Sequence, residues 1–262
     1  MIHPSAVIEP QAVIGEGTTI GEGCFIGKHV VIGKHNTIAS QVVIDGYTTI
    51  GEHNTIGTHT VLGTAPQDIK STSTDVGLII GDHNQIGAEI LISAGTDHGG
   101  KITRIGDHNR LMDRIHIGHD GQMQHHCLME EASALGGHVI IASHVTLGKT
   151  AAVHQFVEIG EGAIVSQDAA LTQDLPPYCI ATGNRAKVSG LNLELLPALS
   201  IPQTEIDALK EAYHTLFETH LSPKAHAISA LETETLETLK TLYHFIANSK
   251  RGIPFRRNTD VN

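Results

Sequence analysis

Large aliphatic residues recur at every sixth position through most of this chain. The series runs without interruption from Ile2 to Leu62, and a second uninterrupted series runs from Ile105 to Leu171. Many of these residues are followed directly by glycine. An amphipathic α-helix repeats its apolar positions about every 3.6 residues and a half-buried strand every second residue, so neither element explains the pattern. A strict period of six is typical of a hexapeptide β-helix, a prism of short strands joined by corners.

Two interruptions of this series predict loops that leave the prism. Between Leu62 and Ile80 polar residues, Asp68 among them, occupy the apolar position, and the segment contains a proline. A second, glycine-rich stretch between Ile92 and Ile105 takes 13 residues and shifts the phase by one. Long excursions from a rigid scaffold often carry binding residues, although a merely tolerated insertion explains the first break equally well. The closeness of the two breaks indicates that one side of the solenoid is built for contact.

The solenoid is predicted to end at residues 174–177, which read Asp-Leu-Pro-Pro. Proline has no N–H to donate to a strand ladder, so it stops the repeat. We therefore expect an all-β solenoid of hexapeptide repeats over residues 1–177 and a small α-helical C-terminal domain over residues 178–262.

Two helices are expected in the C-terminal domain. A helical stripe of apolar residues runs from Ile206 to Phe217, and Thr204 with Asp207 loosely resembles a capping box at its start. A second helix is predicted from Glu232 to Asn248, with leucines on one face. Both stripes are most simply explained by core packing.

Four hexads share a Gly-x-His-Asn corner. Asparagine tolerates the left-handed backbone conformation that tight corners require, so it is expected to take that conformation here. The histidines before it are then exposed corner residues and not metal ligands. These histidines are His35, His53, His83 and His108.

Composition narrows the class of protein. Aromatic residues make up 3% of the chain and there are 27 glycines, which suits a narrow prism filled by aliphatic side chains. The formal net charge of −11 argues against generic nucleic-acid binding, which needs a basic surface. The three cysteines show no paired spacing and predict reduced thiols in a cytoplasmic protein. There is no apolar run long enough to span a membrane and no export signal at the start.

Three histidines are expected at one edge of the prism on consecutive coils. His119 and His138 are 19 residues apart, and His138 and His154 are 16 apart, both close to the 18 residues of one coil. With 19 histidines in the chain, chance alignment also accounts for such a set. If the set is functional, it is either a Zn²⁺ site or a general base with backbone N–H groups nearby for an oxyanion.

The general-base interpretation fits the neighbouring residues better. Asp120 follows His119 and could fix its tautomer, although adjacent strand residues point to opposite faces, which argues for an indirect contact. Glycine at positions 136 and 137, before His138, leaves backbone N–H groups open to a substrate carbonyl. No serine or cysteine accompanies a histidine in the manner of a covalent nucleophile.

The chain closely resembles the acyl-carrier-protein–UDP-N-acetylglucosamine O-acyltransferase family of lipid A biosynthesis. The shared motifs are the hexads, Pro66 to Lys70, His116 to Asp120, Gly137-His138, Ala152 to Phe156, Gln173 to Tyr178, Gly183 to Ala186 and Lys250 to Gly252. The resemblance implies a left-handed parallel β-helix, a homotrimer with active sites between neighbouring prisms, and a reaction without metal or bound cofactor. The substrates it implies are a (3-hydroxy)acyl group on acyl carrier protein and UDP-N-acetylglucosamine.

The resemblance also implies roles for individual residues. His119 matches the catalytic base, Asp120 its supporting carboxylate and Gly137 the N–H donor to the oxyanion. The matching substrate-contact positions are Asp68, Lys70, His116, His138, His154, Gln155, Asn192 and Glu194. Gln167 takes the place of a glycine that limits acyl length in the family, which predicts a shorter hydroxyacyl chain.

Several positions depart from the family pattern. The second loop carries Ser93 and Ala94 where the family usually has His or Asn before Arg-Gly-Thr. A basic residue expected near Ala198 is missing, and Arg185 or Lys187 could substitute for it. These changes leave open a diverged paralogue that acylates a 3-amino sugar nucleotide.

Two alternatives come from other classes, a trimeric β-helical zinc carbonic anhydrase and a non-catalytic solenoid scaffold. The C-terminal helices disfavour the first. The locally basic tail offers either a docking surface for the acidic carrier protein or merely a solvated end. Its basic residues are Lys250, Arg251, Arg256 and Arg257.

Overall fold

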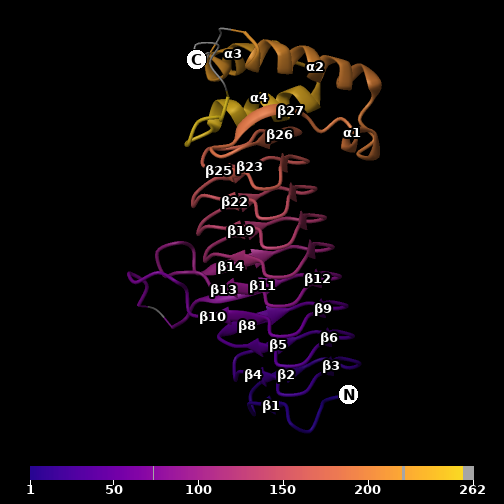
Figure 1. The fold of residues 1–262 in the computed structure, drawn as a ribbon, viewed down its shortest axis with the longest axis vertical. Helices are drawn as coiled ribbons and strands as arrows, with labels where there is room; N and C mark the ends of the chain where they lie inside the picture. Colours follow the sequence, from indigo (N-terminus) through magenta and orange to yellow (C-terminus); the bar gives the residue numbers. More distant parts are fainter. Residues whose placement is uncertain (73, 220–221, 256–262) are drawn as a thin grey trace.

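The computed structural model describes residues 1–72, 74–219 and 222–255, and it confirms the predicted β-solenoid. Short strands stack in three sheets along the length of a prism, and helices gather at its C-terminal end (Figure 1). Strand pairing is parallel throughout the solenoid, and the final pair, β26 with β27, is antiparallel.

The three sheets contain the following strands. Sheet 1 consists of β1 (Val7–Ile8), β4 (Phe25–Ile26), β7 (Val43–Ile44), β10 (Val61–Thr64), β13 (Leu91–Ser93), β16 (His116–Ile117), β19 (Ala134–Leu135), β22 (Ala152–Val153) and β25 (Ala170–Leu171). Sheet 2 consists of β2 (Val13–Ile14), β5 (Val31–Ile32), β8 (Tyr47–Ile50), β11 (Gly77–Ile80), β14 (Ile102–Ile105), β17 (Gln122–Met123), β20 (Ile140–Ile141) and β23 (Glu158–Ile159). Sheet 3 consists of β3 (Thr19–Ile20), β6 (Thr37–Ile38), β9 (Thr55–Ile56), β12 (Gln85–Ile86), β15 (Arg110–Leu111), β18 (Leu128–Met129), β21 (Thr146–Leu147), β24 (Ile164–Val165), β26 (Cys179–Thr182) and β27 (Lys187–Leu191).

The hexad residues form the core of the prism. Ile26, Ile44 and Leu62 lie one above another in sheet 1 with no exposed surface, and the same column continues through Ile92 and Ile117. Burying each such side chain contributes about 1.5–3 kcal/mol of transfer free energy. The repeat therefore stabilises the solenoid coil by coil.

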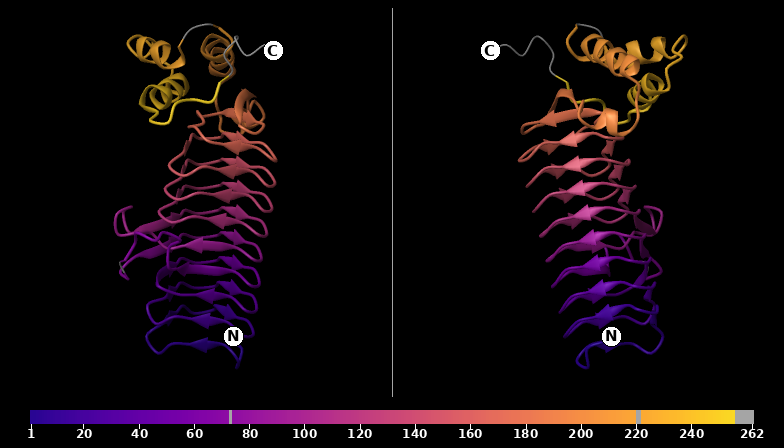
Figure 2. Two further views of the ribbon diagram at one scale, coloured as in Figure 1. Left: turned by 60° about the vertical axis from the view of Figure 1, so that its left-hand side comes forward. Right: turned by 90° about the vertical axis from the view of Figure 1, so that its right-hand side faces the viewer.

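Both breaks in the repeat leave the solenoid at the same corner. The register between β10 and β13 pairs Val61 with Leu91, whereas an uninterrupted coil pairs residues 18 apart, such as His116 with Ala134. The extra residues form two loops, 65–76 and 94–101, that project side by side from the prism (Figures 1 and 2). The expectation that one side carries both loops is confirmed.

Each corner of the prism has its own character. The loop corner joins sheet 1 to sheet 2 and comprises the two loops and residues 118–121, 136–139 and 154–157. The histidine corner joins sheet 2 to sheet 3. The third corner joins sheet 3 to sheet 1 and includes residues 166–169.

At the histidine corner, exposed imidazole rings form a stacked column with centroids 4.9–5.0 Å apart. The column consists of His35, His53, His83, His108, His126 and His144. The four predicted corner histidines are exposed as expected. The prediction that asparagine adopts the left-handed conformation is wrong, because the histidines do so, with φ of 56–62°.

The asparagines of this corner are instead buried hydrogen-bonding groups. Asn54 Nδ2 donates to Asn36 Oδ1 at 3.0 Å and to Gly81 O at 2.9 Å. Asn84 repeats the pattern one coil further on by donating to Asn54 Oδ1. A buried amide that satisfies corner carbonyls is worth more here than an asparagine in the left-handed conformation.

The C-terminal part contains α1 (Leu195–Ala198), α2 (Gln203–Phe217), α3 (Pro223–Ala230) and α4 (Glu237–Asn248). α2 confirms the first predicted helix, but its N-cap is Pro202 without a side-chain cap, so the capping box is wrong. The second predicted helix begins later than expected, at Glu237, and α1 and α3 were not predicted. No helix in the described ranges is long and apolar enough to cross a membrane.

Buried Asp174 fastens the end of the chain to the solenoid. Its Oδ1 accepts from Glu158 N at 2.9 Å, and its Oδ2 accepts from Ser249 Oγ at 2.7 Å and from Arg251 N at 3.1 Å. The Arg251 guanidinium donates to Thr172 O. Arg251 thus faces the prism, Lys250 is exposed, and Arg256 and Arg257 of the expected basic dock lie outside the described residues.

Candidate active site

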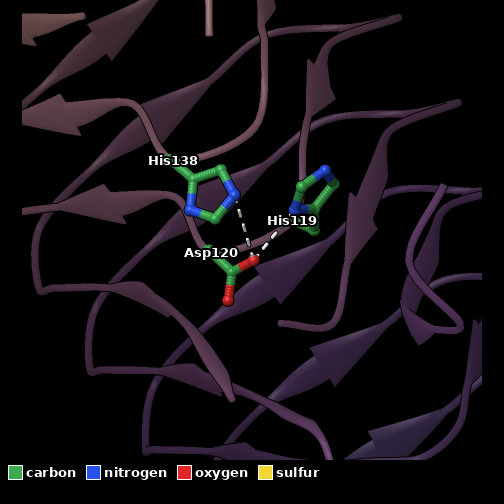
Figure 3. Close-up of side chains that lie close together, drawn as sticks. All are labelled: His119, Asp120 and His138. Carbon is green, nitrogen blue, oxygen red and sulfur yellow. Dashed lines mark hydrogen bonds and ion pairs between the residues drawn. The ribbon is translucent and has the colours of Figure 1, made fainter. Parts of the chain in front are cut away.

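Three polar side chains converge at the loop corner, one coil beyond the loops (Figure 3). His119 Nδ1 lies 2.8 Å from Asp120 Oδ2, and His138 Nε2, on the next coil, lies 3.7 Å from the same oxygen. The two imidazole rings meet edge to face with centroids 5.0 Å apart. The His119–Asp120 contact is direct, contrary to the expectation from strand geometry, because Asp120 is a corner residue with φ of 59°.

Asp120 is 3% exposed, and its carboxylate is fixed from the second loop. Thr96 donates to it twice, from N to Oδ1 at 2.9 Å and from Oγ1 to Oδ2 at 2.7 Å. The Asp120 N–H donates to Thr103 Oγ1 at 2.9 Å. Because a carboxylate held in this way accepts the Nδ1 proton of His119, the Nε2 atom of His119 is left as the free basic atom.

Gly137 lies against the His119 ring. A Cβ atom at this position would come within 2.6 Å of Cε1 and Nε2 of His119, so only glycine fits. Gly137 is buried, and among residues 1–72, 74–219 and 222–255 its N–H has no acceptor. Corner amides at the same point of other turns are capped by a side chain, as when Lys149 N donates to Glu130. A buried, unpaired N–H beside a histidine is suited to an oxyanion.

Burial keeps two further histidines of this region neutral. It lowers the pKa of His138, and the neighbouring His119 lowers it further against the opposing charge of Asp120. Burial also lowers the pKa of His116, which lies half-buried on β16. Both rings therefore offer one donor and one acceptor near neutral pH.

The first loop brings Asp68 to this corner. Its Oδ1 accepts from Lys70 N at 2.9 Å, and its Oδ2 lies 3.1 Å from His98 Nε2. Lys70 itself is exposed. Sequence reasoning missed Thr96 and His98, and the only signal was the second break in the repeat, which located their loop without assigning its residues.

The described residues contain one group with donor atoms close enough for a metal ion, His119, Asp120 and His138, within 4.8 Å of one another. The Asp120 oxygen nearest both histidines already accepts the Thr96 hydroxyl, and only one carboxylate and two imidazoles converge. This donor set is not the three-histidine site of a zinc hydratase. It is better suited to holding a proton on His119.

The comparisons with known proteins agree with this geometry. The family model described as UDP-N-acetylglucosamine O-acyltransferase, domain 2, matches residues 174–254. An acyl-[acyl-carrier-protein]–UDP-N-acetylglucosamine O-acyltransferase from Nautilia profundicola is 45% identical over 192 residues, which are 73% of this chain and 74% of that protein. The chain belongs to this O-acyltransferase family.

Solved structures extend the similarity to the whole chain. UDP-N-acetylglucosamine acyltransferase from Campylobacter jejuni matches with a TM-score of 0.92 at 36% identity, covering 98% of this chain and 100% of that one. A second UDP-N-acetylglucosamine acyltransferase structure matches with a TM-score of 0.95 over the same shares. The fold shared by this O-acyltransferase family is the left-handed parallel β-helix with a C-terminal helical part. Neither a carbonic anhydrase nor a scaffold is favoured.

Of the other predicted residues on this corner, His154 and Gln155 lie on the coil after His138. The residue in register with His138 is Phe156, whose ring stacks on it at 4.3 Å, and not His154. His154 Nδ1 lies 3.1 Å from Gln155 O and 3.3 Å from Arg251 Nη2. His154 thus connects the active corner to the C-terminal segment.

Four predicted residues of the O-acyltransferase site lie elsewhere in this chain. Asn192 donates from Nδ2 to Gly162 O, on the line of the histidine corner, and exposed Glu194 precedes α1. Gln167 is exposed at the third corner. Arg185 lies in the exposed turn between β26 and β27. A single chain therefore does not bring them to His119.

The departures from the family pattern are also placed. Ser93 and Ala94 are buried at the base of the second loop, and the Ser93 hydroxyl has no partner in the part of the chain that the structure describes. Ala198 is exposed on α1. None of the three touches the His119–Asp120 pair in the contacts described above.

Proposed function

We propose that this protein transfers a (3-hydroxy)acyl group from acyl carrier protein to the 3-hydroxyl of UDP-N-acetylglucosamine, the first step of lipid A biosynthesis. The observation that carries the proposal is the pairing of a carboxylate-oriented histidine with a buried, unpaired N–H at one corner. Family membership supports the substrates, because the relatives' names specify both.

In the proposed reaction, His119 Nε2 removes the proton from the sugar 3-hydroxyl while Asp120 holds the Nδ1 proton. The sugar oxygen attacks the thioester carbonyl, and the Gly137 N–H stabilises the oxyanion that forms. Collapse of this intermediate forms the ester and expels the thiolate of the carrier. The thiolate takes the proton from His119, which returns the base to its neutral state. No metal or cofactor takes part.

We further propose a cytoplasmic homotrimer whose sites lie between neighbouring prisms. Asn192, Glu194 and Gln167 are far from His119 around the prism, so they reach the substrate only from another copy. Phe156 supports this arrangement, since its ring is 50% exposed beside His138 and awaits a covering surface. Sedimentation equilibrium tests it, and a monomer at assay concentration would exclude it.

The proposed division of labour places catalysis on residues 1–177 and the cover of the solenoid end on residues 178–262. Contacts of Lys70, His116, His138, His154, Gln155 and Arg185 with substrate belong to the same proposal. So does a short acyl pocket closed by Gln167. Replacing Gln167 with glycine is expected to lengthen the preferred chain.

The deciding experiment assays purified protein with acyl-carrier thioesters of graded length, each with UDP-N-acetylglucosamine and with its 3-amino analogue. We expect ester formation with the hydroxyl acceptor and a preference for short 3-hydroxyacyl chains. Amide formation alone would replace this function with that of a paralogue. Turnover with neither acceptor would reject it.

A further inference from the structure

One side chain, His98, connects the two loops of the loop corner. Its Nε2 lies 3.1 Å from Asp68 Oδ2 in the first loop, and its Nδ1 lies 3.0 Å from Asp97 Oδ1 in its own loop. A neutral imidazole has one N–H, so it would turn a lone pair toward one of these carboxylates. The imidazolium form has a donor for each of them. Both ring nitrogens are therefore occupied and neither is left for a substrate proton.

The segment that carries His98 is fixed to the catalytic pair on both sides. Two residues earlier, Thr96 donates twice to Asp120. One residue later, a Cβ on Gly99 would come within 2.2 Å of Asp120 Oδ2 and 2.5 Å of His138 Cε1. The backbone next to His98 thus rests directly on the active corner, and the His98 ring lies 6.5 Å from that of His138.

We propose that His98 is a positioning residue for the sugar-nucleotide acceptor, holding Asp68 and the first loop at a set distance from His119. This inference rests on the proposed function, since Asp68 is the expected acceptor contact. It differs from a purely structural role in one respect. Asp68 belongs to a loop whose remaining link to residues 94–101 through a side-chain ion pair is the exposed contact between Lys101 and Asp75.

The arrangement makes the acceptor site sensitive to pH. The hydrogen bond to Asp97 raises the pKa of His98, and the contact with Asp68 raises it further. The Lys70 N–H, and then His98, hold the pKa of Asp68 below its usual range. The charged groups facing His98 are Asp68, Asp97 and, more distantly, His138. The contact is present while His98 is protonated and is lost as pH rises through its raised pKa.

The test compares His98→Ala, His98→Gln and Asp97→Asn, with His214→Ala as a matched control. His214 also pairs with a carboxylate, Glu218, at 2.7 Å, but on exposed α2 away from the loops. Initial rates are measured with the sugar nucleotide varied at saturating acyl donor. Because exposed ion pairs contribute modestly, we expect His98→Ala to raise KM for the nucleotide roughly three- to tenfold with kcat nearly unchanged.

The remaining variants separate positioning from a general loss of structure. His98→Gln keeps an N–H donor toward Asp68 and should restore KM while removing the fall of kcat/KM at high pH. Asp97→Asn should move that fall to lower pH. His214→Ala should change neither. An unchanged KM in His98→Ala, or a loss confined to kcat, would overturn the inference even though the acyltransferase reaction stood.

A measurement without turnover keeps the two proposals apart. The ¹⁵N shifts of the His98 ring report its protonation directly, in wild type and in Asp68→Asn. We expect the titration midpoint of His98 to fall in the variant. An unchanged midpoint would refute the contact with Asp68, whereas an inactive wild type would refute only the proposed function.

Discussion

At the histidine corner one turn repeats coil after coil, with six stacked imidazole rings outside and hydrogen-bonded asparagines inside. At the loop corner the same hexads produce a different turn on almost every coil. Two coils open into loops, the next buries Asp120, and the next two present His138 and Phe156 at the equivalent position. Both corners place histidines at left-handed positions, yet only one of them combines a histidine with a carboxylate and an unpaired N–H.

This contrast shows how a repeat separates stability from chemistry. The interior of each coil is secured by the aliphatic columns, so a corner can vary without loss of the fold. Repetition satisfies every buried group at the histidine corner, whereas irregularity at the loop corner leaves the Gly137 N–H without a partner. Unsatisfied buried groups are costly, and an active site is where that cost has a use.

The largest expected effect that separates the corners comes from His119→Ala. Removing the base should lower kcat/KM by roughly 10²–10⁴. His83→Asn is the matched control, since it removes an exposed ring from the histidine corner and keeps a residue that tolerates the left-handed turn. Both variants should keep the wild-type circular dichroism spectrum. Equal activities for the two would erase the distinction between the corners.

Gly137→Ala should have the next largest effect. Its Cβ would come within 2.6 Å of the His119 ring, so the ring has to move from its place beside the oxyanion donor. We expect a loss of roughly 10²–10³ in kcat, the range for a displaced donor. Gly190→Ala is the control, because a Cβ there meets nothing within 4 Å. A Gly137→Ala enzyme as active as Gly190→Ala would show that this glycine has no catalytic role.

Much of this fold follows from the sequence, because a six-residue period dictates where strands and corners fall. Counting along the repeat also located the loops and the corner of His119. The count did not reveal that Phe156, and not His154, lies in register with His138, because loose spacing of 16 and 19 residues hid the true step of 18. Thr96 and His98 lie where the period fails, so no pattern assigned them. α3 was missed although Ser222 and Pro223 form a cap and first turn, because its stripe is short.

Asn54→Ala should show the opposite behaviour to the catalytic variants. The change leaves the Gly81 carbonyl and the Asn84 N–H buried without their partners, each at a cost of about 1–3 kcal/mol. We expect a lower free energy of unfolding, measured by urea titration, with kcat unchanged below the transition. A stable protein with lowered kcat would contradict the assignment of this corner to stability.

The smallest expected effect concerns the pH dependence of the histidine column. Burial, followed by the charges of His144, His108 and His125, holds the pKa of His126 below its ordinary value, and Asp107 opposes this only in part. The unfolded chain then binds more protons than the folded one as pH falls through about 6.5, so stability declines on the acid side and is unaffected well above it. His126→Asn should flatten this decline in urea unfolding between pH 5.5 and 7.5. His59→Asn provides the comparison, because His59 is exposed at a left-handed turn of the third corner. If both variants keep the wild-type pH slope, the stacked rings titrate independently and the column is a by-product of the repeat.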